Sequence, residues 1–137
     1  NRNKAMFEKG GVSYVYLCYG IHHLFNIVTN QINKPQAVLI RAIKPISGIN
    51  YMLQRRKMNK LSYNLTSGPG KVSQALGITL NHNMQSLEGP QIFIKENKTH
   101  ILSKNIISSP RVGVDYAGED SLKPWRFRIK KSPWCGK

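Results

Sequence analysis

The sequence predicts a single compact α+β domain with a mostly antiparallel sheet and a few short helices. Its 137 residues, 40% of them apolar, suffice for one modest core. Short β-branched and aromatic runs separated by glycine and proline are typical of strands joined by turns, and only two segments have the spacing of an amphipathic helix. Because no repeat or low-complexity linker divides the chain, residues 1–137 are assigned to one domain.

Two neighbouring runs predict a hairpin near the start of the chain. Residues 12–18 and 21–29 are apolar, aromatic and β-branched, and Gly20 between them favours a reversal with an exposed tip. A third apolar run covers residues 37–43 and is interrupted only by Arg41. Shorter strands are expected at 91–95, 111–115 and 125–130, the last with apolar Trp125, Phe127 and Ile129 alternating with basic Arg126, Arg128 and Lys130.

Residues 48–58 and 69–76 are the two expected helices. In the first, apolar residues recur three and four positions apart, and basic residues lie near its carboxyl end, where the helix dipole favours them. The second opens with Pro69 and ends before Gly77, which are typical helix start and stop signals. Ser67 is expected to cap this second helix.

Charge limits the classes of partner. Lys and Arg number 21 against six Asp and Glu, which gives a net charge of +15. Such a field is tolerated most readily when the partner is a polyanion, so nucleic acid is favoured. An anionic membrane surface is a weaker alternative because no long basic amphipathic helix is evident, and a generally basic proteome from an AT-rich genome is a third. No apolar run is long enough for a membrane span, and the first residues do not resemble a secretory signal.

The cysteines and histidines do not predict a metal or cofactor site. Cys18 and Cys135 lie near opposite ends of the chain and give neither a disulfide framework nor a ligand spacing, which favours a reducing cytoplasm. Cys18 is interpreted as a small core residue. His22 and His23 are adjacent in a strand and therefore face opposite sides, so no zinc site is expected.

Three tyrosines in the first strand and its turn could contact a nucleobase. Tyr14 and Tyr16 share a strand face and could equally be core residues. Tyr19 lies at the predicted bend, which is usually solvated, so a core position explains it poorly. An exposed aromatic side chain beside a basic surface suits insertion into a DNA stack.

Several polar residues stand in unusual places. Asn26 lies in an apolar strand, where its amide either bonds the backbone or reads a base edge. Arg41 interrupts a buried-type strand with no obvious acidic partner, so a missing carboxylate, a phosphate or water would have to pair with it. The turn from Ser67 to Lys71 could cap a helix or also hold a DNA phosphate, but it lacks the spacing of a P-loop.

The acidic residues are too few and too poorly placed to suggest a catalyst. All six lie in polar or loop-like segments: Glu8, Glu88, Glu96, Asp115, Glu119 and Asp120. None occupies a buried strand, where its pKa could be raised for acid–base work. The residues alone therefore indicate a basic DNA- or RNA-binding domain, and a non-catalytic RNA-binding or ribosome-associated protein remains the alternative.

Five blocks of sequence, in order, resemble the methylpurine-DNA (alkyladenine, 3-methyladenine) glycosylase family. They are YVYLCYGIHHLFNIV, AVLIRAIKP, SGPGKVSQALGI, RVGVDYAGEDSLKPWRF and SPW, and the likeness extends over nearly the whole chain. The resemblance implies a curved antiparallel sheet from which a hairpin projects into the minor groove. It implies a base-excision repair enzyme that flips alkylated or deaminated purines out of duplex DNA and hydrolyses their N-glycosidic bond, acting as a monomer without a cofactor or a membrane, in the cytoplasm or nucleus.

The resemblance also assigns roles to residues. Tyr19 corresponds to the tyrosine that fills the gap left by the flipped nucleotide, and Tyr16 to an aromatic residue stacked on the extruded base. Asn26 corresponds to a pocket amide that disfavours guanine, and Arg41 to an arginine near the hydrolytic water and the general base. Contacts to the DNA backbone are expected, with less weight, from Met6, Gly20, Ile21, His22, Ser67, Lys71, Ala117 and Gly118.

Two departures from the family pattern bear on activity. His22 and His23 stand where relatives more often have aromatic or apolar residues, so the contacts beside the wedge differ. The family's general-base glutamate, a second stacking tyrosine and a histidine lie upstream of the segment that matches Arg2 to Phe7. Since the first residue is Asn1 and not methionine, the chain is expected to be an N-terminally truncated form that binds DNA but hydrolyses poorly.

Overall fold

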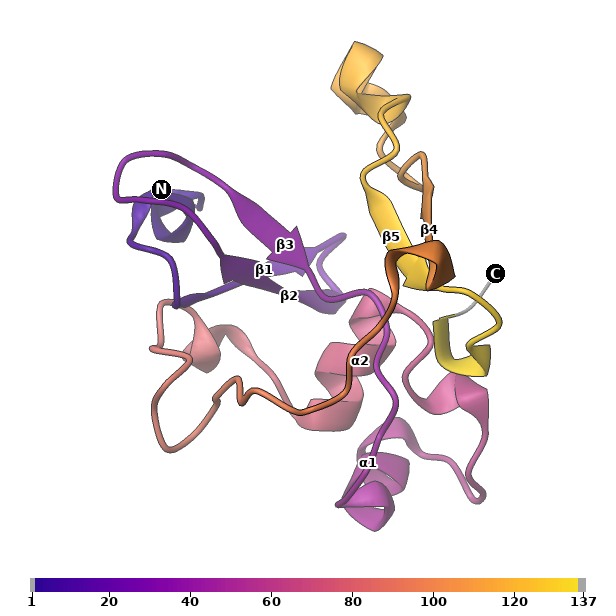
Figure 1. Cartoon of the computed structure of the whole chain (residues 1–137). Coiled ribbons are helices and arrows are strands. Elements are labelled where there is room, and N and C mark those ends of the chain that lie inside the picture. Colours follow the sequence, from indigo (N-terminus) through magenta and orange to yellow (C-terminus); the bar gives the residue numbers. More distant parts are fainter. Residues whose placement is uncertain (1, 136–137) are drawn as a thin grey trace.

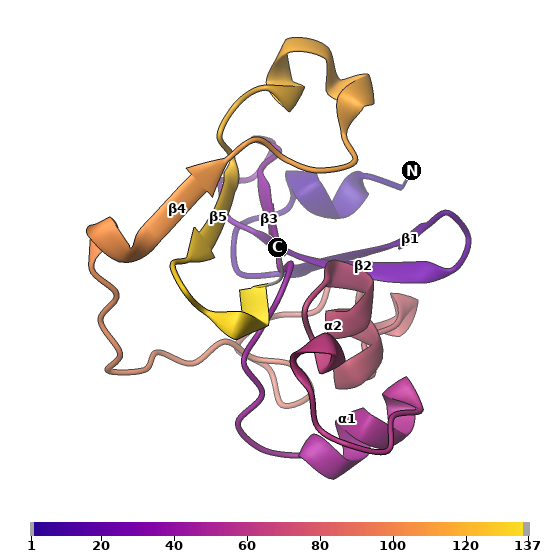
Figure 2. The same cartoon turned by 90° about the vertical axis from the view of Figure 1, so that its right-hand side faces the viewer.

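β2 (His22–Val28) is the central strand of a three-stranded antiparallel sheet, between β1 (Ser13–Cys18) and β3 (Ala37–Leu39). The computed structural model describes residues 2–135, so the predicted domain bounds, residues 1 and 137, lie just outside it. The predicted β1–β2 hairpin is confirmed. Figure 2 shows it projecting to one side of the molecule with α2 (Pro69–Leu76) beneath it.

The pairing register of the hairpin fixes which side chains share a face. Tyr16 lies opposite Leu24, and Tyr14 lies opposite Asn26. Asn26 is also opposite Leu39 of β3. Because side chains on a strand alternate between faces, these residues form one continuous face across three strands.

The two helices form where they were expected. α1 (Ile49–Arg56) packs on α2, and α2 packs on β2. α2 begins at Pro69 and ends against Gly77, whose φ of 72° is left-handed and inexpensive for glycine. The expected cap by Ser67 is wrong, because Gly68 is the N-cap residue and no side chain caps the helix.

The core lies entirely in the first two-thirds of the chain. One cluster, centred on Val15 and Phe25, joins the hairpin to the segment after α2. A second surrounds Tyr14 and Val28, and a third, around Leu65, joins α1 to α2. Between residues 88 and 135 no residue is buried. The hairpin and α2 are therefore the best-anchored parts of the described chain.

The last third of the chain departs most from the sequence prediction. β5 (Arg126–Ile129) confirms the strand expected at 125–130, and it pairs with β4 (Ile106–Ser109), which the sequence did not predict. The strand expected at 91–95 is wrong, since that segment makes only an isolated bridge. The strand expected at 111–115 is also wrong, because the chain turns there into a 3₁₀ segment. Figure 1 shows β4 and β5 as a separate ribbon on the β3 side of the sheet.

The two faces of β5 are oriented in an unexpected way. Phe127 is 66% exposed, and Ile129 is also exposed, whereas Arg126 and Arg128 are half-buried. The cationic face is thus turned toward the rest of the molecule and the apolar face outward. β3 is likewise shorter than the predicted strand at 37–43, so Arg41 lies two residues beyond its end. None of the helices described between residues 2 and 135 is long and apolar enough to cross a membrane.

Two buried serines predict opposite effects on stability. Ser73 in α2 is 1% exposed, and its hydroxyl has no hydrogen-bond partner among the described residues. We expect Ser73→Ala to raise the free energy of unfolding by about 1 kcal/mol, because an unpaired buried hydroxyl is removed. Ser13 is equally buried but accepts the Gln85 N–H at 3.0 Å and contacts two carbonyls.

Ser13→Ala is the matched control. It leaves these buried partners unpaired, so it should lower the free energy of unfolding by about 1–3 kcal/mol. Urea denaturation followed by circular dichroism compares the two variants directly. A loss of stability in Ser73→Ala equal to that in Ser13→Ala would show that the Ser73 hydroxyl does have a partner.

Candidate base pocket and DNA interface

A cavity of about 420 Å³ lies beside the hairpin tip, and five of the predicted site residues line it: Tyr16, Tyr19, His22, Arg41 and Lys71. Four separate parts of the chain supply its walls: the hairpin, the end of β3, the start of α2 and the segment before Tyr116. They contribute Tyr16, Cys18, Tyr19, His22, Leu24, Leu39, Arg41, Gly68, Pro69, Gly70, Lys71, Val112, Gly113, Val114 and Tyr116. Its volume is within the range of small-ligand sites.

The hairpin turn presents Tyr19 to solvent in a strained conformation. Tyr19 has φ of 50° and Gly20 has φ of 72°, and the Ile21 N–H donates to the Cys18 carbonyl at 3.2 Å. Two successive positive φ values are the pattern of a type I′ turn, which favours asparagine or glycine at its first central position. A tyrosine there costs conformational energy and remains 84% exposed. Strain of this kind in an exposed aromatic residue points to a functional role.

Tyr16 forms an aromatic wall of the cavity. Its ring lies 5.2 Å from that of Tyr14, which is part of the core, and the guanidinium of Arg2 lies 4.8 Å above it. Burial raises the pKa of Tyr16, Cys18 and the neighbouring tyrosines raise it further, and Arg2 partly offsets them. The phenol is therefore neutral at physiological pH, and its ring contacts Tyr14 and the Arg2 guanidinium.

Arg41 brings a half-buried positive charge to the cavity. Burial lowers the pKa of Arg41, and the nearby Arg126 of β5 lowers it further. An arginine stays protonated at neutral pH regardless, so this shift measures the cost of holding the charge there. Within residues 2–135 no carboxylate forms an ion pair with Arg41. The ion pair in these residues joins Lys123 and Asp120. The acidic partner that the sequence left open is not supplied by these residues.

The start of α2 supplies backbone groups and a second cation. Lys71 lines the cavity and donates from its ammonium to the Asn64 side-chain oxygen. Gly70 lies against the ring of His22, and a Cβ atom at Gly70 would be only 3.1 Å from that ring. The N–H groups of Gly70 and Lys71 in the first turn of α2, together with the Lys71 ammonium, suit a DNA phosphate.

Asn26 lies deeper than the cavity surface. It is 7% exposed, and its side-chain nitrogen donates to the carbonyls of Tyr14, at 3.1 Å, and Leu24, at 3.3 Å. Asn26 shares a strand face with Leu24 and His22, which line the cavity, but is not itself part of the lining. Since both its N–H groups serve the backbone, the amide has only its oxygen left for any other contact.

The remaining predicted contact residues divide into two groups. Gly20, Ile21 and His22 form or flank the exposed tip, as a groove-inserting hairpin requires. Met6, Ser67, Ala117 and Gly118 do not line the cavity, and Met6 packs instead against the Tyr14 cluster.

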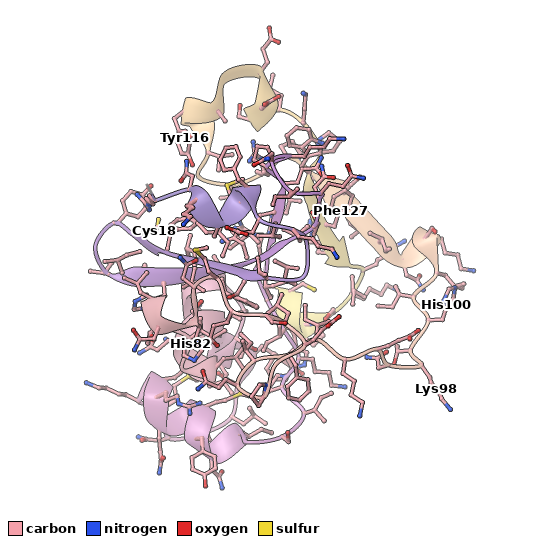
Figure 3. The ribbon with its side chains drawn as sticks, turned by 90° about the vertical axis from the view of Figure 1, so that its left-hand side faces the viewer. Cys18, His82, Lys98, His100, Tyr116 and Phe127 are labelled. Carbon is pink, nitrogen blue, oxygen red and sulfur yellow. The ribbon has the colours of Figure 1, made fainter. Side chains whose placement is uncertain are left out.

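Tyr116 and Cys18 are cavity residues that sequence reasoning missed. Figure 3 shows Tyr116 above the hairpin end that carries Cys18, with Phe127 on the other side of the view. Tyr116 is 86% exposed and faces the same cavity as Tyr16. The interpretation of Cys18 as a core residue is wrong, since it is only half-buried and lines the cavity. The signal available for Tyr116 was its place in RVGVDYAGEDSLKPWRF, one of the five blocks that resemble a known family.

The cavity has no acidic lining. None of the six carboxylates contributes to its walls, and five of the six are exposed. In the part of the chain that the structure describes, no three His, Cys, Asp or Glu side chains lie together as ligands for a metal ion. The geometry thus offers aromatic faces, two cations and helix N–H groups, which bind and orient an anionic or planar ligand.

Comparison with known proteins identifies the family. The model of the methylpurine-DNA glycosylase family matches residues 1–133. The chain belongs to the methylpurine-DNA glycosylase family. A relative from Chlamydia felis is 54% identical over 96% of this chain and 68% of its own length, and one from Bacillus mycoides is 43% identical over the whole chain and 71% of its own length. Both carry the provisional name 3-methyladenine DNA glycosylase.

The comparisons confirm the predicted family and its class, a DNA repair enzyme that hydrolyses N-glycosyl bonds. A third relative, from Chlamydia pneumoniae, is 50% identical over 93% of this chain but only 64% of its own length. The chain therefore spans about two-thirds of the length of the curated methylpurine-DNA glycosylase relatives that it matches.

The strained turn predicts that this family member gives up stability at Tyr19. Tyr19→Asn introduces a residue that favours the type I′ turn, so we expect it to raise the free energy of unfolding by about 1 kcal/mol. Tyr19→Phe keeps both the strain and the ring and should leave stability unchanged. Equal stability of the Asn and Phe variants in urea denaturation would contradict the strain at this position.

Proposed function

We propose that this protein binds duplex DNA at a damaged purine, inserts Tyr19 into the stack and holds the extruded base in the cavity between Tyr16 and Arg41. The single observation that supports this most is the placement of Tyr16, Tyr19, Arg41 and Lys71 around one cavity at the hairpin tip. These residues come from three separate segments, and each suits a different part of a flipped nucleotide.

The exposed tip lowers the cost of flipping. Removing a base from the stack costs a few kcal/mol, least when damage has already weakened pairing or stacking. Tyr19 projects from the turn and can fill the gap that the base leaves. Lys71 and the start of α2 are placed to hold the displaced backbone by its phosphate. The net charge of +15 adds attraction that does not depend on sequence.

The cavity walls suit a planar purine. Tyr16 supplies one aromatic face, and Tyr116, from the other side of the chain, supplies a second exposed ring. Stacking on such rings tolerates a range of alkylated or deaminated bases. Asn26 shares the strand face of Leu24 and keeps only its amide oxygen for a contact with the edge of the base.

Hydrolysis needs a group that the cavity walls do not provide. Arg41 can orient a water or a carboxylate beside the sugar, but no carboxylate among residues 2–135 lines the cavity to take the proton from water. The ammonium of Lys71 donates to Asn64 and keeps further N–H groups for a phosphate, and we assign it no Schiff-base role. We infer that residues 1–137 bind the lesion, and that a carboxylate base from outside them is needed to excise it.

The role of Tyr19 can be measured by binding. Tyr19→Ser should weaken binding to a duplex with an abasic-site analogue roughly 5- to 100-fold, because the stacking of one aromatic ring is lost. Tyr19→Phe is the matched control and should bind as the parent does. Fluorescence anisotropy at fixed salt gives both values. Unchanged affinity of Tyr19→Ser, or tighter binding of single-stranded RNA than of the abasic duplex, would overturn the proposal.

The absence of a lining carboxylate predicts binding without efficient turnover. Residues 1–137 should bind an alkylated duplex yet release the damaged base far more slowly than a longer family member such as the Chlamydia felis relative. Single-turnover assays that follow release of 3-methyladenine compare the two proteins. Release at equal rates would show that the base is supplied from within this chain.

A further inference from the structure

A second cavity, of about 480 Å³, lies on the other side of His22. It is bounded by the hairpin, by Arg55 near the end of α1, and by α2. Its walls are Ile21, His22, His23, Arg55, Gly70, Ser73, Gln74, Gly77, Ile78 and Thr79. His22 and Gly70 also line the base pocket, so their contact forms the partition between the two cavities.

The second cavity is cationic and rich in hydrogen-bond donors. Arg55 donates from one Nη to the Ala75 carbonyl at 3.1 Å, and its guanidinium lies over Gly77, where a Cβ atom would be 3.0 Å away. The glycine therefore leaves the space that the guanidinium occupies. No carboxylate of residues 2–135 pairs with Arg55 or lines this cavity.

Other donors face the same space. His22 is exposed and His23 half-buried, and both residues line the cavity with an imidazole, which can donate a hydrogen bond. Ser73 also lies in the wall, but its hydroxyl oxygen is buried and not accessible from the cavity. A guanidinium and two imidazoles attract an anion with several acceptor oxygens, whereas a metal cation would be repelled by Arg55.

We propose that this cavity binds a backbone phosphodiester of the duplex, one that flanks the nucleotide held in the base pocket. The inference rests on the proposed function, because it uses the same hairpin tip to place the DNA. Tyr19 and Ile21 are two residues apart at that tip, and they line the base pocket and the second cavity respectively. DNA that receives Tyr19 in its stack then brings a neighbouring phosphate toward the cavity that Ile21 and Arg55 line. The His22 partition then separates the flipped nucleotide from the backbone beside it.

The salt dependence of DNA binding tests this assignment. Affinity for DNA falls as salt rises, and each phosphate neutralised by the protein steepens the slope of log affinity against log salt by about 0.9. Arg55→Gln keeps an amide donor for the Ala75 carbonyl but removes the charge. We expect Arg55→Gln to make this slope shallower by about 0.9 and to weaken binding to an abasic-site duplex about tenfold at low salt.

Two variants serve as controls. Lys60→Gln removes an equally exposed cation that lines neither cavity, and it should change the slope by much less. Arg55→Lys keeps the charge and should restore the slope. Thermal melts of the free variants show whether each is folded, and His23→Gln offers a second cavity variant that leaves α1 untouched.

The outcomes separate this inference from the proposed function. If the parent prefers an abasic duplex and Arg55→Gln keeps the parent slope, the phosphate site is wrong and the proposed function stands. If the parent shows no duplex preference, both fail. Histidine ring resonances should shift with a short duplex and not with inorganic phosphate at equal ionic strength. A shift with inorganic phosphate, together with an unchanged slope for Arg55→Gln, would assign the cavity to a free anion and overturn the DNA source.

Discussion

The antiparallel pairing of β1 with β2 is the interaction on which both cavities depend. The register sets Cys18 opposite His22 and so leaves Tyr19, Gly20 and Ile21 as the connection. A slip of β1 by one residue would turn Tyr16 away from the base pocket while Leu24 of β2 stayed in place. Packing of Val15 and Phe25 against the segment after α2 holds this register from the opposite face. The tip can be exposed and strained because its base is well packed.

α2 converts the hairpin into a binding surface. Its first turn closes the base pocket, and its last turn closes the second cavity. The helix lies close enough for this because Gly70 and Gly77 have no side chains where His22 and Arg55 pack. A side chain at Gly70 would displace the His22 ring, and a side chain at Gly77 would displace the Arg55 guanidinium, unless the helix itself moved. The two cavities thus depend on two close contacts of α2, one with the hairpin at Gly70 and one with α1 at Gly77.

The electrostatics of the site are unbalanced in one direction. Arg41, Arg126 and Lys71 lie around or behind the base pocket, and Arg55 lines the cavity beside it. Such an arrangement attracts phosphate strongly, but alone it disfavours a base made cationic by alkylation. A carboxylate next to Arg41 would both lower this repulsion and accept a proton from water. The same excess of positive charge therefore favours phosphate binding and creates the need for a carboxylate from outside the described residues.

Local sequence signals determined the hairpin, both helices and the aromatic tip. The apolar, aromatic and β-branched composition of residues 12–18, the glycine at position 20 and the Pro69–Gly77 boundaries act over short distances, so they can be read directly. The five family blocks located Tyr16, Tyr19 and Arg41. Tertiary structure alone decided what lies between segments distant in sequence. Tyr116 reached the base pocket and Arg55 the second cavity through packing that no local pattern encodes. Tertiary structure also turned the cationic face of β5 inward. Alternation along a strand predicts two different faces but does not predict which face packs against the rest of the protein.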